Sequence, residues 1–226
     1  MTTVLTGWHW LRDPTRLSDG TPLRRTVALP PGEKPVLGKV GFHASREPLS
    51  ALFFAPGTYV CRVRLAGRLH EDDIQAVGTR RELVAGPVDA SRELRLFAAE
   101  CARSALVAFE VKHPDDPRVR RAIAVARCYV SGKASDRDLE AARSGALAAA
   151  GSELDPGAEH AARAAAEAAH PDASCAAWWA AWESSNFSPY WGRRWSEHDR
   201  ALAWRLRKLF KPVFDCPPSE PDELFR

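Results

Sequence analysis

The sequence has few cysteines, and their spacing lacks the patterns of disulfide-bonded and zinc-binding proteins. The five cysteines are odd in number and widely separated, with no Cys-x-x-Cys pair and no cluster with histidine. This spacing argues against a disulfide framework and against a structural zinc site. We therefore expect a cytoplasmic protein in a reducing compartment, without a metal centre.

Long apolar runs are also lacking. No segment approaches the roughly 20 apolar residues of a membrane span, because Glu, Arg, His and Pro interrupt even the alanine-rich stretch near 141–181. The first residues lack the basic-then-apolar pattern of a secretory signal. The formal net charge is only +3 over 226 residues, so no strong global attraction to nucleic acid or membrane follows. We expect neither a membrane span nor a signal peptide.

The short motifs of several enzyme classes are missing as well. The chain has no phosphate-binding P-loop, no dinucleotide-binding Gly-x-Gly-x-x-Gly, no metalloprotease His-Glu-x-x-His and no Gly-x-Ser-x-Gly elbow. These absences remove the usual sequence evidence for P-loop nucleotide hydrolysis, zinc proteolysis and serine hydrolysis. Function must therefore be argued from less specific features.

A change of composition near residue 88 predicts two parts. Before it, Pro and Gly recur between short β-branched and aromatic bursts; after it, Ala dominates and Gly becomes rare. We predict an α+β protein with a small mixed domain over 1–88. An Ala- and Trp-rich helical domain over 89–212 follows, and a polar, Pro-rich tail over 213–226 ends the chain.

The N-terminal part predicts strands around one short helix. The strands are expected at 4–11, 36–43, 59–69 and 76–85, and the helix at 48–55. The strand at 59–69 has the clearest alternation. Its apolar face would carry Tyr59, Cys61, Val63 and Leu65, and its other face Arg62 and Arg64.

The later part predicts a series of capped helices. The first covers 91–112. The next begins after Asp116 with Pro117 and ends at Gly132, and a capping box of Ser135 and Asp138 opens the third. Three more are expected to open at Asp155-Pro156, at His170-Pro171 and at Ser196 with Asp199, the last of them ending before Pro212.

The segment 41–69 carries the most recognisable pattern of the chain. Its notable residues are Gly41-Phe42-His43, Pro48-Leu49 and Gly67, and the acidic turn Glu71-Asp72-Asp73 follows it. On these residues, the stretch over about 37–85 resembles an uncharacterised bacterial and phage domain family with Gly-Phe-His followed by Pro-Leu. Many members have cysteines beside Gly-Phe-His, whereas this chain has none there. The family has no settled activity, so the resemblance implies a module and not a function.

A more distant similarity is to ADP-ribosyltransferase folds, which place a His, an aromatic or hydroxyl residue and a Glu on successive strands. Here that order is met by His9, Phe42-His43 and Glu82. The similarity implies NAD as cofactor, and His9, His43 and Glu82 as catalytic groups. The implied cofactor-binding residues are Phe42, Ser45 and Tyr59. In this chemistry the carboxylate stabilises the positive charge that develops on the ribose as nicotinamide leaves.

Each of these residues also has a structural interpretation. His43 could anchor its turn through a backbone hydrogen bond, and Ser45 could cap the helix that begins at Pro48. Glu82 could be a solvent-facing strand carboxylate paired with Arg80 or Arg64. His9 could lie partly buried between two tryptophans.

The C-terminal region gathers tryptophans and basic residues. Its partner-binding candidates are Trp191, Arg194, Arg200, Trp204, Arg207 and Lys211. Basic groups with aromatic rings suit single-stranded nucleic acid, and a basic amphipathic helix suits a protein groove or a membrane surface. The alternative is that the tryptophans fill gaps between Ala-rich helices while the arginines face solvent.

Together these features favour a non-catalytic binding or adaptor protein of bacterial or phage-linked conflict, with an unidentified protein partner. Nucleic acid is a second partner class, and the Ala-rich helices could also bury their faces against a second copy. The alternative function is an NAD- or nucleotide-using enzyme of ADP-ribosyltransferase-like type.

Overall fold

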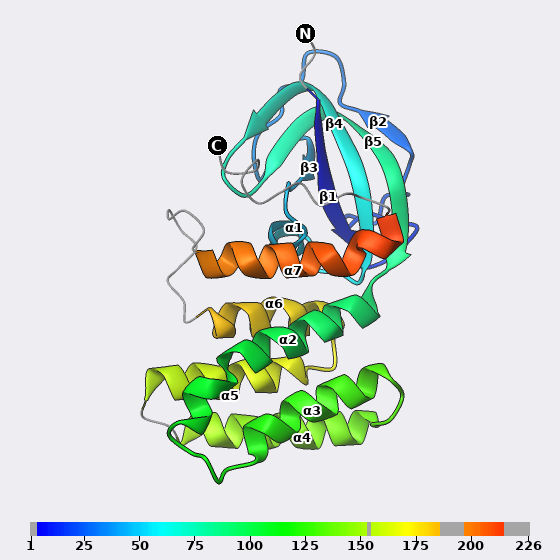
Figure 1. The fold of residues 1–226 in the computed structure, drawn as a ribbon. Coiled ribbons are helices and arrows are strands. Elements are labelled where there is room, and N and C mark those ends of the chain that lie inside the picture. The colour runs from blue at the N-terminus through cyan, green and yellow to red at the C-terminus, as the bar shows by residue number, and fades with distance from the viewer. Residues whose placement is uncertain (1–3, 153–154, 186–196, 215–226) are drawn as a thin grey trace. The chain divides into compact units, whose positions relative to one another are not determined.

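The computed structural model describes residues 4–152, 155–185 and 197–214 (Figure 1). The chain forms two compact units. The N-terminal unit contains the described residues up to Ala90 and the end of the last helix from Phe210. The helical unit runs from Ser91 to Leu209. A strand-rich first part followed by helices confirms the predicted α+β class.

The N-terminal unit is built on one antiparallel sheet. Its strands are β1 (Leu5–Leu11), β2 (Thr26–Ala28), β3 (Phe42–Ala44), β4 (Tyr59–Glu71) and β5 (Ala76–Asp89). The order is β1-β4-β5-β2, and β3 pairs with the start of β5. Directly after β3, the Ser45 backbone exchanges two hydrogen bonds with Trp8 of β1 (2.7 and 3.1 Å). The strands β1, β4, β5 and β3 therefore close into a ring.

The interior of this ring follows from the alternation of β1 and β4. A buried cluster contains Leu5, Leu11, Ala44, Cys61, Val63, Leu65 and Ala76. The predicted apolar face of β4 is confirmed, because Cys61, Val63 and Leu65 are buried while Arg64 is exposed. Trp8 and Trp10, on the alternate positions of β1, contact the Phe210 ring at centroid distances of 5.7 and 5.6 Å. Both faces of β1 are thus buried.

The predicted strand at 36–43 is wrong over most of its length. Only Phe42–Ala44 is a strand, and Val36 instead forms a tight turn in which its N–H donates to the Val40 carbonyl (2.7 Å). Gly38 and Gly41 have φ values of 69° and 111°, which glycine adopts without strain. The apolar residues of 36–40 looked like a strand because alternation alone does not show where glycines reverse the chain.

Other boundaries of the N-terminal unit need smaller corrections. The helix α1 spans Pro48–Phe54, and its N-cap is Glu47, so Ser45 does not cap it. The strand β5 extends to Asp89, past the predicted end at 85. The strand β2 was not predicted, because three residues give too little alternation to recognise.

The helical unit contains the remaining helices. They are α2 (Ser91–Glu110), α3 (Arg118–Val130), α4 (Asp136–Gly151), α5 (Pro156–Ala168), α6 (Ala173–Ser184) and α7 (Glu197–Phe214), whose last residues belong to the N-terminal unit. The helix α5 packs against α2, α3, α4 and α6. Its buried residues are all alanines. These small side chains let several helices approach one central helix.

Helix capping confirms some predicted boundaries and corrects others. The Ser135–Asp138 capping box is present, and Asp155 caps α5. The cap of α6 is Asp172 and not His170-Pro171. The N-cap of α3 is Pro117, one residue later than predicted, and α7 continues past Pro212 to Phe214. The predicted Ser196 cap of that helix lies outside the described residues.

Gly145 in α4 offers a stabilising substitution. A Cβ placed there meets no atom within 4 Å, so Gly145→Ala should raise the free energy of unfolding by about 1 kcal/mol through helix propensity. The matched control is Gly132→Ala, where space is equally open but φ is +70°. That change should lower stability by about 1 kcal/mol. Urea unfolding, followed by the helical circular dichroism signal, measures the stability of both variants. Equal stability changes for Gly145→Ala and Gly132→Ala would contradict this prediction.

Candidate functional site

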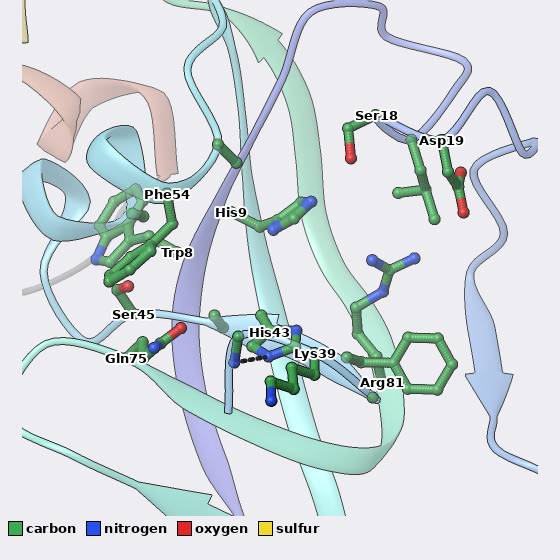
Figure 2. A pocket seen from close by; sticks show the side chains of 17 residues that line it. Trp8, His9, Ser18, Asp19, Lys39, His43, Ser45, Phe54, Gln75 and Arg81 are labelled. Carbon is green, nitrogen blue, oxygen red and sulfur yellow. Dashed lines mark hydrogen bonds between the residues drawn. The ribbon is translucent and has the colours of Figure 1, made fainter. Parts of the chain in front are cut away.

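A cavity of about 490 Å³ lies in the N-terminal unit (Figure 2). Four residues predicted from the sequence line it: His9, Phe42, His43 and Ser45. Other polar or charged groups in its wall are Ser18, Asp19, Lys39, Gln75 and Arg81, and the large apolar ones include Trp8 and Phe54. The structure therefore brings together residues from β1, β3, β5, α1 and the loops around 17–19, 38–41 and 75.

The pairing of the strands places the two histidines at this cavity. His9 lies opposite Cys61 in the β1–β4 register, on the side of β1 that faces the ring interior. The short β3 carries His43 against Val77 of β5. A Cβ on Gly7 would come within 2.9 Å of both Ala44 Cβ and the Ser45 carbonyl oxygen. Glycine at position 7 thus allows β3 to approach β1 closely enough for both histidines to share one wall.

His43 is fixed by its turn. The Gly38 N–H donates a hydrogen bond to His43 Nε2 (2.9 Å), as the dashed line in Figure 2 shows. Nε2 is therefore unprotonated, and a neutral ring carries its proton on Nδ1. Burial lowers the pKa of His43, and backbone groups of Gly41 and Val36 oppose this shift. The side chain holds the turn at 36–41 against β3 as a neutral imidazole.

His9 is also neutral at physiological pH. Burial lowers the pKa of His9 to about 4, helped by the charge of Arg81 and by His43, and a backbone hydrogen bond with His43 acts in the opposite direction. The cavity wall therefore presents two neutral imidazoles beside one guanidinium. Neutral rings can donate or accept hydrogen bonds without adding charge to the site.

Arg81 is the residue that sequence reasoning missed. Its side chain enters the cavity from β5 and is only 3% exposed. The guanidinium carbon lies 5.4 Å from the centroid of the Phe42 ring, a cation–π contact. Burial lowers the pKa of Arg81, with Cys61 and Asp19 opposing this effect. The sequence offered one indication that Arg81 faces the interior. It lies two residues before Leu83 on β5, and Leu83 packs against the interior cluster.

Glu82 and Tyr59 do not line the cavity. Glu82 follows Arg81 on β5 and so points to the other face of the strand, where Oε2 accepts a hydrogen bond from Arg64 Nη1 (2.7 Å). Tyr59 packs against the interior cluster at the start of β4. The three groups implied by the ADP-ribosyltransferase similarity are therefore not assembled at one place. Asp19 does line the cavity, but its Oδ1 accepts two hydrogen bonds from Thr21.

The C-terminal candidates are only partly described. Trp191 and Arg194 lie outside the described residues, and for Arg200 and Lys211 only the helical backbone is described. Trp204 and Arg207 are half-buried on α7, and Lys208 Nζ lies 3.6 Å from the centroid of a Trp204 ring.

A second hollow of about 390 Å³ in the helical unit is lined by Leu96, Phe97, Glu100, Arg127, Arg205, Lys208 and Leu209. Cations outnumber anions in its lining.

The α3–α4 region carries exposed cations. Arg118 and Arg120 pair with Asp116 and Glu110. In contrast, four exposed cations form no salt bridge within the part of the chain that the structure describes: Arg121, Arg127, Lys133 and Arg137. We call these four residues the basic surface of α3 and α4. Three exposed carboxylates, Asp136, Asp138 and Glu140, lie on α4 as well.

The comparison with protein families places one part of the chain. Residues 88–171 match the family described as "Imm-5 like putative immunity protein". The match covers less than half of the chain and runs from the end of β5 through α5. It includes the basic surface of α3 and α4 but not the cavity. No curated protein and no solved structure matches the chain.

Several kinds of site are not found in the described parts of the chain. Among those residues, no helix is both long and apolar enough to cross a membrane. The same residues contain no group of three or more His, Cys, Asp or Glu side chains that could hold a metal ion.

Cys61, Cys101, Cys128 and Cys175 are free thiols, and burial raises the pKa of Cys61 to about 12. Its thiol is therefore unreactive at neutral pH.

Proposed function

We propose that this chain is a non-catalytic immunity protein of bacterial conflict, whose helical unit binds a protein toxin. The family match over residues 88–171 carries this proposal, because an immunity protein protects a cell by neutralising a toxin. The matched segment supplies α2, α3, α4 and α5. The partner contacts are therefore expected on the outer faces of these helices.

The basic surface of α3 and α4 indicates the chemistry of the partner. Its four cations are exposed and form no salt bridge within the described residues. Exposed cations attract acidic groups of a partner and raise the association rate. We infer that the toxin presents an acidic surface to α3 and α4.

Co-expression tests the proposed function directly. The chain would be expressed in a bacterial host with each toxin encoded in the same gene cluster, and growth would be measured. Protection against one toxin, together with a stable complex of the two purified proteins, is the expected result. Survival without complex formation would point to enzymatic detoxification and would contradict the binding proposal, as would failure to protect against every toxin of the cluster.

Charge reversal then tests the contact surface. Arg121→Glu with Arg127→Glu should weaken the toxin complex by tenfold or more at low salt, mostly through slower association. The control is Arg24→Glu with Lys34→Glu, which changes the net charge equally at exposed positions outside the matched segment. Surface plasmon resonance at two salt concentrations measures both. Equal effects of the two double variants would remove α3 from the interface.

Several sequence-based predictions stay open beside this proposal. The cytoplasmic location, nucleic-acid binding by the Trp- and Arg-rich C-terminal region, self-association and NAD as cofactor remain predictions. The partner contacts predicted at Arg200, Trp204, Arg207 and Lys211 also remain predictions. Their helix α7 lies outside the segment that matches the family, which is why the test above begins with α3.

A further inference from the structure

The N-terminal cavity contains a guanidinium whose binding edge has no partner. Arg81 Nε and Nη2 are buried, and neither makes a hydrogen bond to any described residue. These two nitrogens lie on the same edge of the guanidinium, the edge that binds both oxygens of one carboxylate or two oxygens of one phosphate. A buried donor without an acceptor destabilises the fold, so its retention calls for an explanation.

The same chain shows what this edge normally does. Arg46 uses Nε and Nη2 to bind both oxygens of Glu71. Arg118 binds both oxygens of Asp116 through the same two nitrogens, and Arg103 uses these nitrogens on Glu100. Those three pairs are at the surface, whereas Arg81 is buried in a cavity wall. Arg81 thus has the donor geometry of a carboxylate-binding arginine, without a protein carboxylate on that edge.

The charges around Arg81 favour an anionic ligand. The charged groups of the cavity lining are Arg81, Lys39 and Asp19. Asp19 makes no salt bridge with Arg81, and its Oδ1 accepts hydrogen bonds from the Thr21 N–H (2.9 Å) and hydroxyl (2.7 Å). The cavity lining therefore has one positive charge in excess, while His9 and His43 are neutral rings that can hydrogen-bond a ligand.

The size and apolar parts of the cavity restrict the ligand further. A volume of about 490 Å³ falls in the range of small-molecule sites. Phe42 lies beside the guanidinium, and Leu17 adds apolar wall. Trp8 and Phe54 line the cavity as well (Figure 2). A ring or short apolar group could pack there. The two Arg81 nitrogens are shielded from solvent, so an incoming ligand would displace a wall side chain to reach them.

We propose that this cavity binds a small organic anion, a carboxylate or phosphate ester with an apolar group, through the Nε and Nη2 edge of Arg81. The site is separate from the toxin-binding surface proposed above, because none of its lining residues lies in 88–171. Loss of either function therefore leaves the other testable.

Calorimetric titration of the full chain with benzoate and with phenyl phosphate tests the proposal. At least one of these anions should bind at neutral pH, and benzyl alcohol, their neutral analogue, should bind at least tenfold more weakly. Arg81→Met and Arg81→Lys should each weaken anion binding at least tenfold. The methionine variant removes the charge, and the lysine variant keeps the charge but removes the paired Nε and Nη2 donors. Arg80→Met, the neighbouring exposed arginine of β5, is the matched control and should bind as the wild type does.

Thermal unfolding without ligand separates a binding role from a structural one. Arg81→Met should keep or raise the unfolding midpoint, because it replaces a buried charge lacking full hydrogen bonding with an apolar side chain of similar length. A lower midpoint would make Arg81 a structural residue and overturn the proposal. Failure of the wild type to bind either anion, or equal binding by wild type and Arg81→Lys, would overturn it too. The choice between benzoate and phenyl phosphate identifies which anion class the site prefers.

Discussion

Phe97→Ala should lower the free energy of unfolding of the helical unit by about 3–5 kcal/mol. Phe97 lies on α2 with no exposed surface, so truncation removes a whole buried ring. The helix α2 packs against α5, whose buried face consists of alanines. Phe97 also lines the hollow of about 390 Å³ beside Leu96 and Leu209, so the truncation enlarges an existing hollow by the volume of the ring.

Val107→Ala on the same helix is the matched control. Val107 is 65% exposed, and its truncation should change stability by no more than about 0.5 kcal/mol. Urea unfolding followed by hydrogen exchange of α2 and α5 peptides measures both variants. A loss near 1 kcal/mol for Phe97→Ala would contradict this expectation and would mean that neighbouring side chains move into the space of the ring.

The helical unit was readily predicted because its signals are local. Ser135, Asp138 and Asp155 are cap residues whose effect depends on a few neighbouring backbone groups, and the structure confirms them. The errors at Pro117, Asp172 and Pro212 are shifts of one to three residues at helix ends. Short-range pattern determines where a helix lies better than where it begins or ends.

The ring of the N-terminal unit could not be predicted in the same way. Closure depends on two backbone hydrogen bonds between Ser45 and Trp8, residues far apart in the sequence. The turn at 36–41 depends on glycines with positive φ, which apolar alternation does not reveal. Long-range pairing is set by the whole sheet, so a single strand pattern carries little information about it.

Only part of the candidate site was predicted, because the long-range strand pairing that assembles it could not be predicted. His9, Phe42, His43 and Ser45 stood out by residue type, and the strands bring them to one cavity. Arg81 was not singled out, because its burial depends on its neighbours β2 and β4. A buried charge on a strand can be recognised from the sequence only once the inward-facing alternation is known.

His9 should make the N-terminal unit less stable at mildly acidic pH. Burial, together with Arg81 and His43, lowers the pKa of His9 from 6.5 to about 4 in the folded chain. Above pH 6.5 the folded and unfolded chains both carry a neutral ring, and its stabilising contribution is complete. As the pH falls below 6.5, the unfolded chain takes up a proton that the folded chain does not. Stability is therefore lost down to about pH 4, by up to about 3 kcal/mol.

His9→Gln should reduce this loss, because glutamine is polar but does not titrate. The charged or titratable groups around His9 are Arg81, His43, Asp19, Lys39 and Cys61. They remain in the variant, so their contributions largely cancel in the comparison. Hydrogen exchange of residues 5–11 and 59–71, corrected for intrinsic rates, should show about 2 kcal/mol less destabilisation between pH 7 and pH 5 for the variant.

His70→Gln tests whether this effect is specific to the cavity. His70 is exposed on β4 of the same sheet, so its replacement should leave the wild-type pH profile in place. Parallel curves of stability against pH for wild type and His9→Gln would mean that His9 takes up a proton equally in the folded and unfolded states. Its placement beside Arg81 would then be wrong. A selective change in His9→Gln would tie the acid sensitivity of the unit to the imidazole that shares its cavity with the unpartnered edge of Arg81.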